Sequence, residues 1–353
     1  MTSLAQAHPS PRHGGDLSVA IKHYGGHAKN WLDLSTGVNP CGYPIPDLDT
    51  ELWRTLPDNP TDLIRVAANY YGCTEQAIEL TPGSQLAIRL LPTLIESPSS
   101  VAIPELGYQE HAHAWSRAGH TIELYQNLTQ LDQLIHQQRV EHAVIINPNN
   151  PSCEIVEPAV LRKISIEIDG LLVLDEAFAD LNPDTSLCPR IGDDHEGVDN
   201  LVIFRSVGKF FGLAGARVGF IISQNEIGRK LGNLLAPWPV NAAAQKVTEC
   251  ALGDQQWQVS QRRKILTRSA ELARLLEMTL CPQGLSISVK SQGLFTTIFG
   301  HNNDLISLHT QLAKQRIWTR LGDTNSQQQN WLRLSLPGNN FATFENALNS
   351  LTL

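Results

Sequence analysis

The chain contains the stretch Ser206-Val-Gly-Lys209-Phe-Phe-Gly-Leu-Ala-Gly-Ala-Arg217-Val-Gly, which joins the apolar segments 201–204 and 218–223. A lysine beside small residues can bring its amine against an aldehyde and form a Schiff base. Arg217 follows beyond two flexible glycines, so the loop can fold back and aim a guanidinium, which suits a phosphate, at the same place. The pair indicates a loop that holds a phosphorylated aldehyde cofactor.

Two other interpretations of this stretch compete with that one. A nucleotide-binding loop requires a serine or threonine directly after the lysine and a glycine five residues before Gly208. Those positions hold Phe210 and Ile203, which excludes that motif. A plain glycine-rich turn between two strands stays open as long as the stretch is considered alone.

The middle of the chain alternates short apolar segments with helical patterns, including a helix predicted over 110–118. Continuous apolar strands separated by helices are typical of a mostly parallel sheet that is covered on both faces. We therefore predict an α/β fold, a three-layer sandwich, whose ligands collect beyond the carboxyl ends of the strands. The predicted strands are 101–103, 121–124, 142–146, 171–174, 201–204 and 218–222.

The pattern changes after about residue 237. We predict a large domain over 41–237 and a smaller α+β domain over 238–353. Residues 1–40 are too short to fold alone, and we expect them to pack against the smaller domain. The predicted elements of the smaller domain are a long helix at 242–278, strands at 285–289, 294–299 and 332–336, and a helix at 305–314.

The composition limits the classes of function. A net charge of −8 without a basic run argues against nucleic acid as a partner, because that binding depends on many lysine and arginine contacts. The six cysteines are scattered, which favours a reducing cytoplasm over a disulfide framework or a zinc site, so we expect no metal. Residues 1–13 lack the apolar core of a secretory signal, and no apolar run is long enough to cross a bilayer. We expect a cytoplasmic protein without a membrane partner.

Polar residues follow two of the predicted strands. Asp175 ends the segment 171–174, where a partly shielded carboxylate can keep a pyridine nitrogen protonated. Asn150 stands in Asn147-Pro-Asn-Asn-Pro151, whose two Asn-Pro steps make a rigid turn that fixes the direction of its amide. Considered one at a time, Asp175 is equally a helix cap and Asn150 part of a plain turn.

A second group of residues suits a phosphate and a ring. Gly83-Ser84-Gln85 precedes a predicted helix at 86–95, and free amides with a hydroxyl at a helix start form an anion site, although a simple cap has the same geometry. Ser206 adds a hydroxyl near the same phosphate. Tyr108 can stack its ring on a cofactor, but a single aromatic beside a turn is weak evidence.

These motifs occur in an order that resembles the aspartate-aminotransferase-like, fold-type-I pyridoxal-phosphate enzymes, and the resemblance covers nearly the whole chain. It implies pyridoxal 5'-phosphate as the cofactor and a class I/II aminotransferase fold for the large domain. It also implies a homodimer. By resemblance Lys209 joins the cofactor covalently, Asp175 pairs with its pyridine nitrogen, Asn150 donates to its ring oxygen and Tyr108 stacks on its ring. The implied phosphate cup is Gly83, Ser84, Gln85, Ser206 and Arg217.

Within this superfamily the chain is most similar to the cobalamin-pathway branch that includes L-threonine-O-3-phosphate decarboxylase. The resemblance lies in His13-Gly-Gly-Asp16, in 33–40 and in 205–215. It implies decarboxylation of L-threonine O-3-phosphate to (R)-1-aminopropan-2-ol phosphate and CO2, by a lyase acting on a phosphorylated amino acid. The implied substrate-binding residues, with Arg333 as the carboxylate clamp, are His13, Gly37, Asn39, Arg320 and Arg333.

Two alternatives stay open. Histidinol-phosphate aminotransferase shares the scaffold, and a non-catalytic pyridoxal-phosphate-binding regulator would share the fold, although no basic recognition helix precedes the phosphate loop. The chain also departs from its relatives at three positions. Phe178 stands where aminotransferases usually have a tyrosine, Gly208 replaces a common serine or threonine, and Leu56 replaces a tyrosine that reaches the neighbouring subunit. The first change weighs against transamination.

Overall fold

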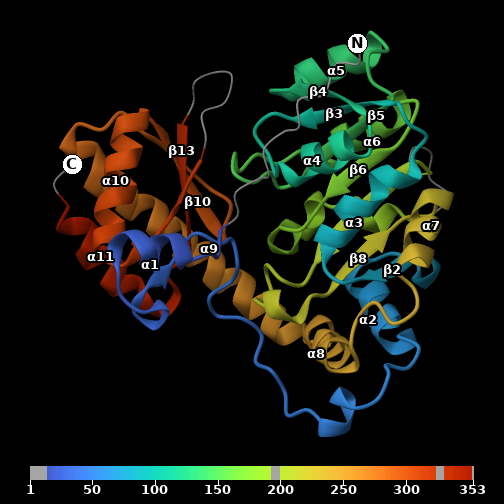
Figure 1. Ribbon diagram of the computed structural model, residues 1–353, viewed down its shortest axis with the longest axis horizontal. Helices are drawn as coiled ribbons and strands as arrows, with labels where there is room; N and C mark the ends of the chain where they lie inside the picture. The colour runs from blue at the N-terminus through green and yellow to red at the C-terminus, as the bar shows by residue number, and fades with distance from the viewer. Residues whose placement is uncertain (1–13, 192–198, 323–329, 352–353) are drawn as a thin grey trace.

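The computed structural model describes residues 14–191, 199–322 and 330–351 and contains two main sheets (Figure 1). The larger has seven strands in the order β2-β8-β7-β6-β5-β3-β4, and only β8 runs antiparallel to its neighbours. Its strands are β2 (Ile78–Thr81), β3 (Ser100–Pro104), β4 (Thr121–Tyr125), β5 (His142–Ile146), β6 (Leu172–Asp175), β7 (Leu201–Ser206) and β8 (Gly219–Ile222). The predicted α/β class with a mostly parallel sheet is confirmed.

Helices cover both faces of this sheet, which explains why its central strands are apolar throughout. Successive side chains of a strand point to opposite faces. In β6, Val173 packs into one core with α3 (Ser84–Leu90), α4 (Glu110–Arg117) and α7 (Glu226–Leu235). Its neighbours Leu172 and Leu174 pack into the other core with α2 (Thr61–Tyr71), α5 (Leu128–His136) and α6 (Pro158–Glu167). Both faces therefore demand hydrophobic residues, and the three layers follow.

The smaller sheet is antiparallel, in the order β12-β13-β10-β9. It packs with the C-terminal helices, and the long helix α9 runs from beside the large sheet to the small one (Figure 1). These elements are α9 (Gln255–Leu280), β9 (Ser288–Ser291), β10 (Phe295–Gly300), α10 (Asn302–Lys314), β12 (Arg320–Leu321), β13 (Asn330–Ser335) and α11 (Phe341–Asn349). The predicted division near residue 237 stays a prediction, since α8 (Ala242–Gly253) packs against α2.

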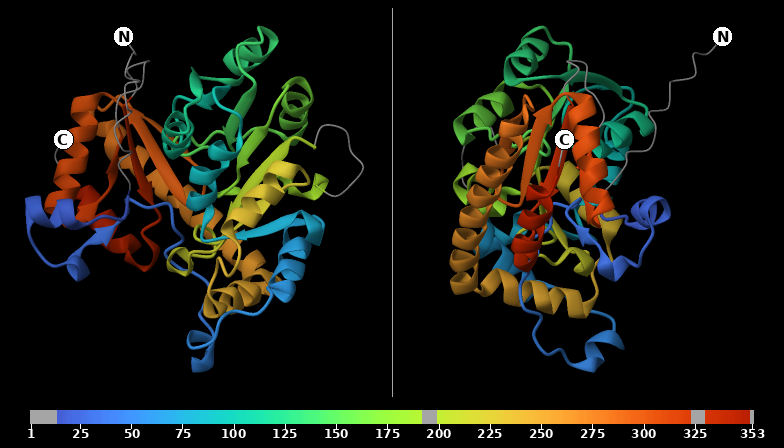
Figure 2. Two further views of the ribbon diagram at one scale, coloured as in Figure 1. Left: turned by 45° about the vertical axis from the view of Figure 1, so that its right-hand side comes forward. Right: turned by 90° about the vertical axis from the view of Figure 1, so that its left-hand side faces the viewer.

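The N-terminal segment lies against the C-terminal elements. Strand β1 (Leu32–Asp33) pairs in parallel with β11 (Ile317–Trp318), and α1 (Ser18–Tyr24) contacts α10; Figure 2 shows these blue and orange segments side by side. This arrangement brings residues just after β1 beside the small sheet. Among the described residues, no helix combines the length and apolar character that crossing a bilayer requires.

Two predicted elements differ from the structure. The helix predicted over 242–278 is two helices, because the Asp254 side chain accepts a hydrogen bond from the Trp257 N–H at 2.9 Å and caps a new helix. The strand predicted at 285–289 lies at Ser288–Ser291 instead. Strand β9 is at the edge of its sheet and is largely exposed, so apolar residues do not mark it.

Candidate functional site

A cavity of about 400 Å³ opens beyond the carboxyl ends of β5, β6 and β7. Segments far apart in the sequence meet there, because parallel strands end at the same edge of a sheet. Every cofactor-binding residue predicted from the sequence lines this cavity. They are Gly83, Ser84, Gln85, Tyr108, Asn150, Asp175, Ser206, Lys209 and Arg217.

Lys209 lies on the loop between β7 and β8, with its side chain partly buried and its Nζ 5.2 Å from the centroid of the Phe178 ring. Burial, and then the charge of Arg333, lowers the pKa of Lys209 from its ordinary 10.5 to about 8. Arg320 and Arg217 act in the same direction, whereas Asp175 opposes them. The amine is therefore far more readily neutral, and hence nucleophilic, than an ordinary lysine.

The lowered pKa predicts how the Lys209 amine reacts in the cofactor-free chain. Only the neutral amine attacks an electrophile, so acetylation of Lys209 by acetic anhydride should rise with pH to a plateau with a midpoint near 8. Peptide mass spectrometry over pH 6 to 11 would measure it, with the exposed Lys264 as internal reference. A midpoint for Lys209 at its ordinary 10.5 would contradict the prediction.

Asp175 ends β6 and is buried, with 4% of its surface exposed. Its Oδ2 lies 3.0 Å from Nε2 of His111, and its Oδ1 accepts a hydrogen bond from the Ala177 N–H at 3.1 Å. The carboxylate is thus fixed in direction at the cavity wall. His111 was missed from the sequence, because nothing in its neighbourhood distinguishes it from the other polar residues of the helix predicted over 110–118.

A chain of polar contacts forms another wall. The Tyr108 hydroxyl donates to Oε1 of Gln85 at 2.6 Å, and the Gln85 amide donates to Glu110. Glu110 is buried and also pairs with Nε of Arg89 at 3.3 Å. Burial, and then Glu110, raises the pKa of Tyr108, so its phenol keeps its proton and acts as a donor. Arg89 lines the cavity, and neither it nor Glu110 was predicted.

Glycine is required where the loop of Arg217 meets the start of α3. Gly83 has a φ of +75°, and a side-chain carbon there would lie 2.6 Å from Nη2 of Arg217. The guanidinium therefore packs directly on backbone, with Nη1 donating to the Ala214 carbonyl at 3.2 Å. Gly208 is similarly confined, since a side chain would meet Cα of Ala214 at 3.2 Å. A serine or threonine at this position would therefore require Ala214 to shift by a few tenths of an ångström.

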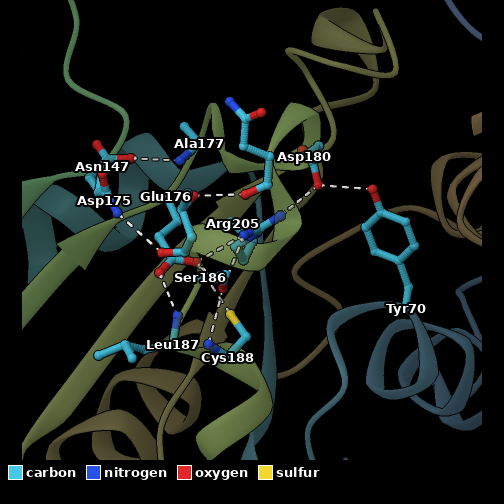
Figure 3. Close-up of polar contacts among 12 residues, drawn as sticks. Tyr70, Asn147, Asp175, Glu176, Ala177, Asp180, Ser186, Leu187, Cys188 and Arg205 are labelled. Atoms are coloured by element: carbon cyan, nitrogen blue, oxygen red, sulfur yellow. Dashed lines mark hydrogen bonds and ion pairs between the residues drawn. The ribbon is translucent and has the colours of Figure 1, made fainter. Parts of the chain in front are cut away.

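A network of buried ion pairs lies next to the site (Figure 3). Arg205, in β7, pairs through Nη1 with Glu176 at 2.9 Å and through Nη2 with Asp180 at 2.6 Å. All three side chains are at most 3% exposed. Glu176 directly follows Asp175, and Arg205 directly precedes Ser206. The network therefore joins the two loops that carry the carboxylate and the lysine.

Helix α9 contacts the same two loops. Nε of Arg262 donates to the Asp180 carbonyl at 2.7 Å, and Nη2 lies 3.1 Å from the Tyr70 hydroxyl, which itself bonds Asp180. The Arg262 guanidinium also lies 5.3 Å from the Phe210 ring centroid. The position of Lys209 thus depends on contacts from α2 and α9 as well as from its own loop.

Two of the predicted substrate-binding residues are neighbours across two strands. Arg320 in β12 stands directly opposite Arg333 in β13. Arg333 is buried; its Nη1 donates to Oδ1 of Asn150 at 2.6 Å, its Nη2 donates to the Ser35 carbonyl, and its Nε has no partner among the described residues. Burial is the main cause that lowers the pKa of Arg333, and the charge of Arg320 is the second. The protonated guanidinium is therefore less favourable here than in water.

The other predicted substrate contacts have different outcomes. Gly37 packs so tightly on Phe178 that a side chain there would lie 2.9 Å from the ring. Asn39 does not direct its amide to a ligand: Nδ2 donates to the Phe210 carbonyl at 2.8 Å, and Oδ1 accepts from Gln261 at 3.2 Å. Its backbone N–H donates to the Lys209 carbonyl at 3.0 Å, so Asn39 positions the lysine loop instead. His13 lies outside the described residues.

Comparison with known proteins agrees with this geometry. Residues 45–351 match the family described as aminotransferase class I and II. The chain belongs to that family. Pyridoxal phosphate is the cofactor of these enzymes, and the predicted family and cofactor are confirmed.

Curated members of the family cover nearly the whole chain. A threonine-phosphate decarboxylase of Pseudomonas aeruginosa is 34% identical over 333 residues, which are 94% of each chain. A threonine-phosphate decarboxylase of Sinorhizobium sp is 33% identical and covers 92% of each chain. A histidinol-phosphate aminotransferase of Sodalis glossinidius is 28% identical over 72% of this chain and 70% of its own length.

Solved structures of the family share the fold. L-threonine-O-3-phosphate decarboxylase from Porphyromonas gingivalis has a TM-score of 0.73 at 19% identity and covers 90% of this chain and 98% of its own. Histidinol-phosphate aminotransferase from Sinorhizobium meliloti, in complex with pyridoxal-5'-phosphate, has a TM-score of 0.78 at 16% identity and covers 100% and 98%. At these identities the likeness establishes the aminotransferase fold.

The residues of the cavity fit the family's cofactor. A primary amine, a fixed carboxylate and a set of phosphate donors line one space, and the glycine at 83 leaves room for backbone to approach. Lys209 would hold the aldehyde carbon, Asp175 the ring nitrogen and Asn150 the ring oxygen. Ser84, Ser206 and Arg217 would hold the phosphate. The chain is a pyridoxal-phosphate-dependent enzyme of this family.

Proposed function

We propose that this chain decarboxylates L-threonine O-3-phosphate, releasing CO2 and (R)-1-aminopropan-2-ol phosphate for cobalamin biosynthesis. The two threonine-phosphate decarboxylases that span more than nine-tenths of the chain support this substrate. The observation that carries the proposal is the pairing of Arg320 with Arg333 beside Lys209. A substrate with two anionic groups is complementary in charge to two adjacent cations.

The energetics of this arginine pair favour a doubly anionic ligand. Like charges directly opposite each other on neighbouring strands destabilise a sheet. Arg333, Arg320 and Arg217 all oppose protonation of Lys209, whereas Asp175 favours it, so the lysine lies in the field of three other cations. A carboxylate at Arg333 and a phosphate at Arg320 would offset that repulsion through charge-assisted hydrogen bonds.

Each residue of the site has a separate role in the proposed reaction. When bound, the cofactor supplies an electron sink for the bond that breaks at the substrate's α-carbon. Asp175, whose direction is fixed by its contact with His111, would pair with the ring nitrogen of the bound cofactor. Arg333 and Arg320 orient the substrate so that its carboxylate leaves. Lys209, whose lowered pKa lets it take up and release a proton near neutral pH, would deliver from its protonated amine the proton that the α-carbon gains when CO2 leaves.

Phe178 bears on the choice between decarboxylase and aminotransferase. Its ring packs on Phe295 with centroids 5.0 Å apart and lies under the Lys209 amine, so it offers no hydroxyl to the cofactor. Aminotransferases usually place a tyrosine there, and histidinol-phosphate aminotransferase is the second candidate.

The experiment that tests the proposed function measures CO2 release from O-phospho-L-threonine without an oxo acid. CO2 release supports the proposal, whereas turnover of histidinol phosphate that depends strictly on 2-oxoglutarate supports the alternative, and no turnover of either supports a regulator.

Replacing either arginine by glutamine should weaken substrate binding. Arg320→Gln and Arg333→Gln should each raise KM for O-phospho-L-threonine roughly 10- to 100-fold, since charged hydrogen bonds contribute about 1.5–3 kcal/mol. Steady-state CO2 release would measure this, with Arg263→Gln on the exposed face of α9 as control. Arg333→Lys should not restore KM, because a point charge cannot grip a carboxylate with two parallel bonds. An unchanged KM in both glutamine variants would refute the assignment.

We also infer a homodimer that acts in the cytoplasm. Three large apolar side chains on residues 45–56 are exposed in the single chain: Ile45 at 69%, Trp53 at 66% and Leu56 at 65%. Such a cluster favours burial against another protein surface. Leu56 has no hydroxyl for a neighbouring cofactor phosphate, so it would contribute packing alone. Analytical ultracentrifugation of the holoenzyme measures the assembly, and a monomer at micromolar concentration would refute it.

A further inference from the structure

Two facing residues of the small sheet contact the turn that carries Asn150. Thr297 in β10 stands directly opposite Arg333 in β13, so both side chains point to the same face of that sheet. Nη1 of Arg333 donates to Oδ1 of Asn150 at 2.6 Å. The Thr297 hydroxyl donates to the carbonyl of the next residue, Pro151, at 2.8 Å. Neighbouring strands of the small sheet therefore hold two consecutive residues of the loop that follows β5.

The contact with Arg333 fixes the direction of the Asn150 amide. A guanidinium can only donate hydrogen bonds, so the amide atom that faces it is the oxygen, and Nδ2 is turned away from Arg333. Over the described ranges of the chain, Nδ2 of Asn150 donates to no other residue. Asn150 lines the cofactor cavity, so this N–H group is available to the ring oxygen of the cofactor.

The two ends of the turn are held from different sides. The amides of Asn147 and Asn149 donate to backbone carbonyls on the large-sheet side, which anchors the start of the turn. Pro151 has no N–H, so its carbonyl is the one backbone group through which it can form a hydrogen bond. Thr297 is the strong donor to that carbonyl, since the Cys153 thiol lies 3.6 Å away and is a weak donor.

Thr297 keeps its contact under conditions in which Arg333 shares its own. In the proposed function Arg333 binds the substrate carboxylate, so its donors are divided between the substrate and Asn150. Thr297 is fully buried and is not among the residues that line the cofactor cavity, so substrate does not compete for its hydroxyl. The branched side chain of threonine is also restricted about its first torsion, which holds the hydroxyl in one direction.

We infer that Thr297 is a positioning residue: through Pro151 it keeps the Asn150 amide directed at the ring oxygen of the cofactor. The inference rests on the role proposed for Asn150 toward the cofactor, and the choice of substrate does not enter it. A hydrogen bond from Asn150 stabilises negative charge on the ring oxygen, which lowers the affinity of the neighbouring lysine linkage for a proton. Loss of the Thr297 hydroxyl should weaken this effect.

The test measures the absorbance of the bound cofactor against pH in the holoenzyme. Thr297→Val, which keeps the shape but removes the donor, should raise the midpoint of this titration by about one pH unit. It should also weaken binding of pyridoxal phosphate to the cofactor-free chain roughly three- to ten-fold. Thr297→Ser retains the hydroxyl and should restore both values. Asn150→Ala should raise the midpoint at least as far as Thr297→Val does.

Thr296→Val is the matched control for a loss of stability. Thr296 is also fully buried, but its hydroxyl lies 3.0 Å from Oγ of Ser291 on the opposite face of β10. Both valine variants should lower the urea midpoint of unfolding to a similar extent, because each loses one buried hydrogen bond. Only Thr297→Val should change the absorbance titration and the affinity for the cofactor.

Three outcomes decide the inference. An unchanged absorbance midpoint in Thr297→Val, or an equal rise in Thr296→Val, would overturn the positioning role. If Asn150→Ala leaves the midpoint unchanged, the assignment of Asn150 and the role of Thr297 fail together. If O-phospho-L-threonine releases no CO2 while the midpoint still depends on the Thr297 hydroxyl, the proposed function fails and the positioning role stands.

Discussion

Replacing Lys209 by alanine is expected to lower kcat for CO2 release roughly 10⁴-fold or more. The variant loses the amine that exchanges the proton at the α-carbon, a step worth about 10²–10⁴-fold in enzymes. It also loses the covalent attachment of the cofactor. Because the Lys209 side chain is only partly buried and packs over the Phe178 ring, its removal should leave the fold intact. Single-turnover measurement of CO2 is the appropriate assay, because kcat will be very low.

A covalent label separates the loss of the amine from a loss of cofactor binding. Borohydride treatment of the unaltered holoenzyme should fix the cofactor on the peptide that contains Lys209, and the same treatment of the alanine variant should leave no labelled lysine. Lys264→Ala is the matched control and should keep both the label and the rate. A labelled peptide that contains another lysine would refute the assignment of Lys209.

Replacing Arg205 by methionine is expected to lower the free energy of unfolding by about 3–5 kcal/mol, the usual cost of leaving buried charges without their partner. Methionine keeps much of the volume but leaves Glu176 and Asp180 as two buried carboxylates without the guanidinium that joins them. Urea denaturation of the cofactor-free chain would measure the change. Arg263→Met, at an exposed position on α9, should change stability by less than about 0.5 kcal/mol.

A compensated variant tests whether unpaired charge is the cause. Combining Arg205→Met with Glu176→Gln and Asp180→Asn removes both carboxylate charges, so part of the lost stability should return. Equal instability of the single and triple variants would point to packing, for example against the Tyr71 ring that lies 4.7 Å from the Arg205 guanidinium carbon. A loss below about 1 kcal/mol in the single variant would contradict the role given to the network.

Three of the residues predicted to bind the cofactor stand at positions that a local sequence pattern distinguishes. Asp175 ends an apolar strand, Asn150 lies between two prolines, and Lys209 lies in a glycine-rich loop. Parallel strands end at one edge, so position along the sequence was enough to bring these residues together. All three line the same cavity.

The site residues that lie on helix α4 could not be predicted from a local sequence pattern. His111 and Glu110 belong to the first turn of α4, where polar residues normally face solvent, yet both are 1% exposed. Only the packing of α4 on the sheet turns His111 toward Asp175. Asn39 shows the reverse case: its side chain is buried and its amide donates to the Phe210 carbonyl, a contact that the motif did not predict.

Sequence alone predicted the α/β class and the segments that meet at the cavity, because hydrophobic periodicity and strand-end positions are local properties of the chain. The family was predicted from the resemblance of its motifs. Tertiary structure alone decided which charges meet. The pairing of Arg320 with Arg333 and the network around Arg205 join segments from different elements. Their contact depends on strand register and helix packing, which no short stretch of sequence encodes.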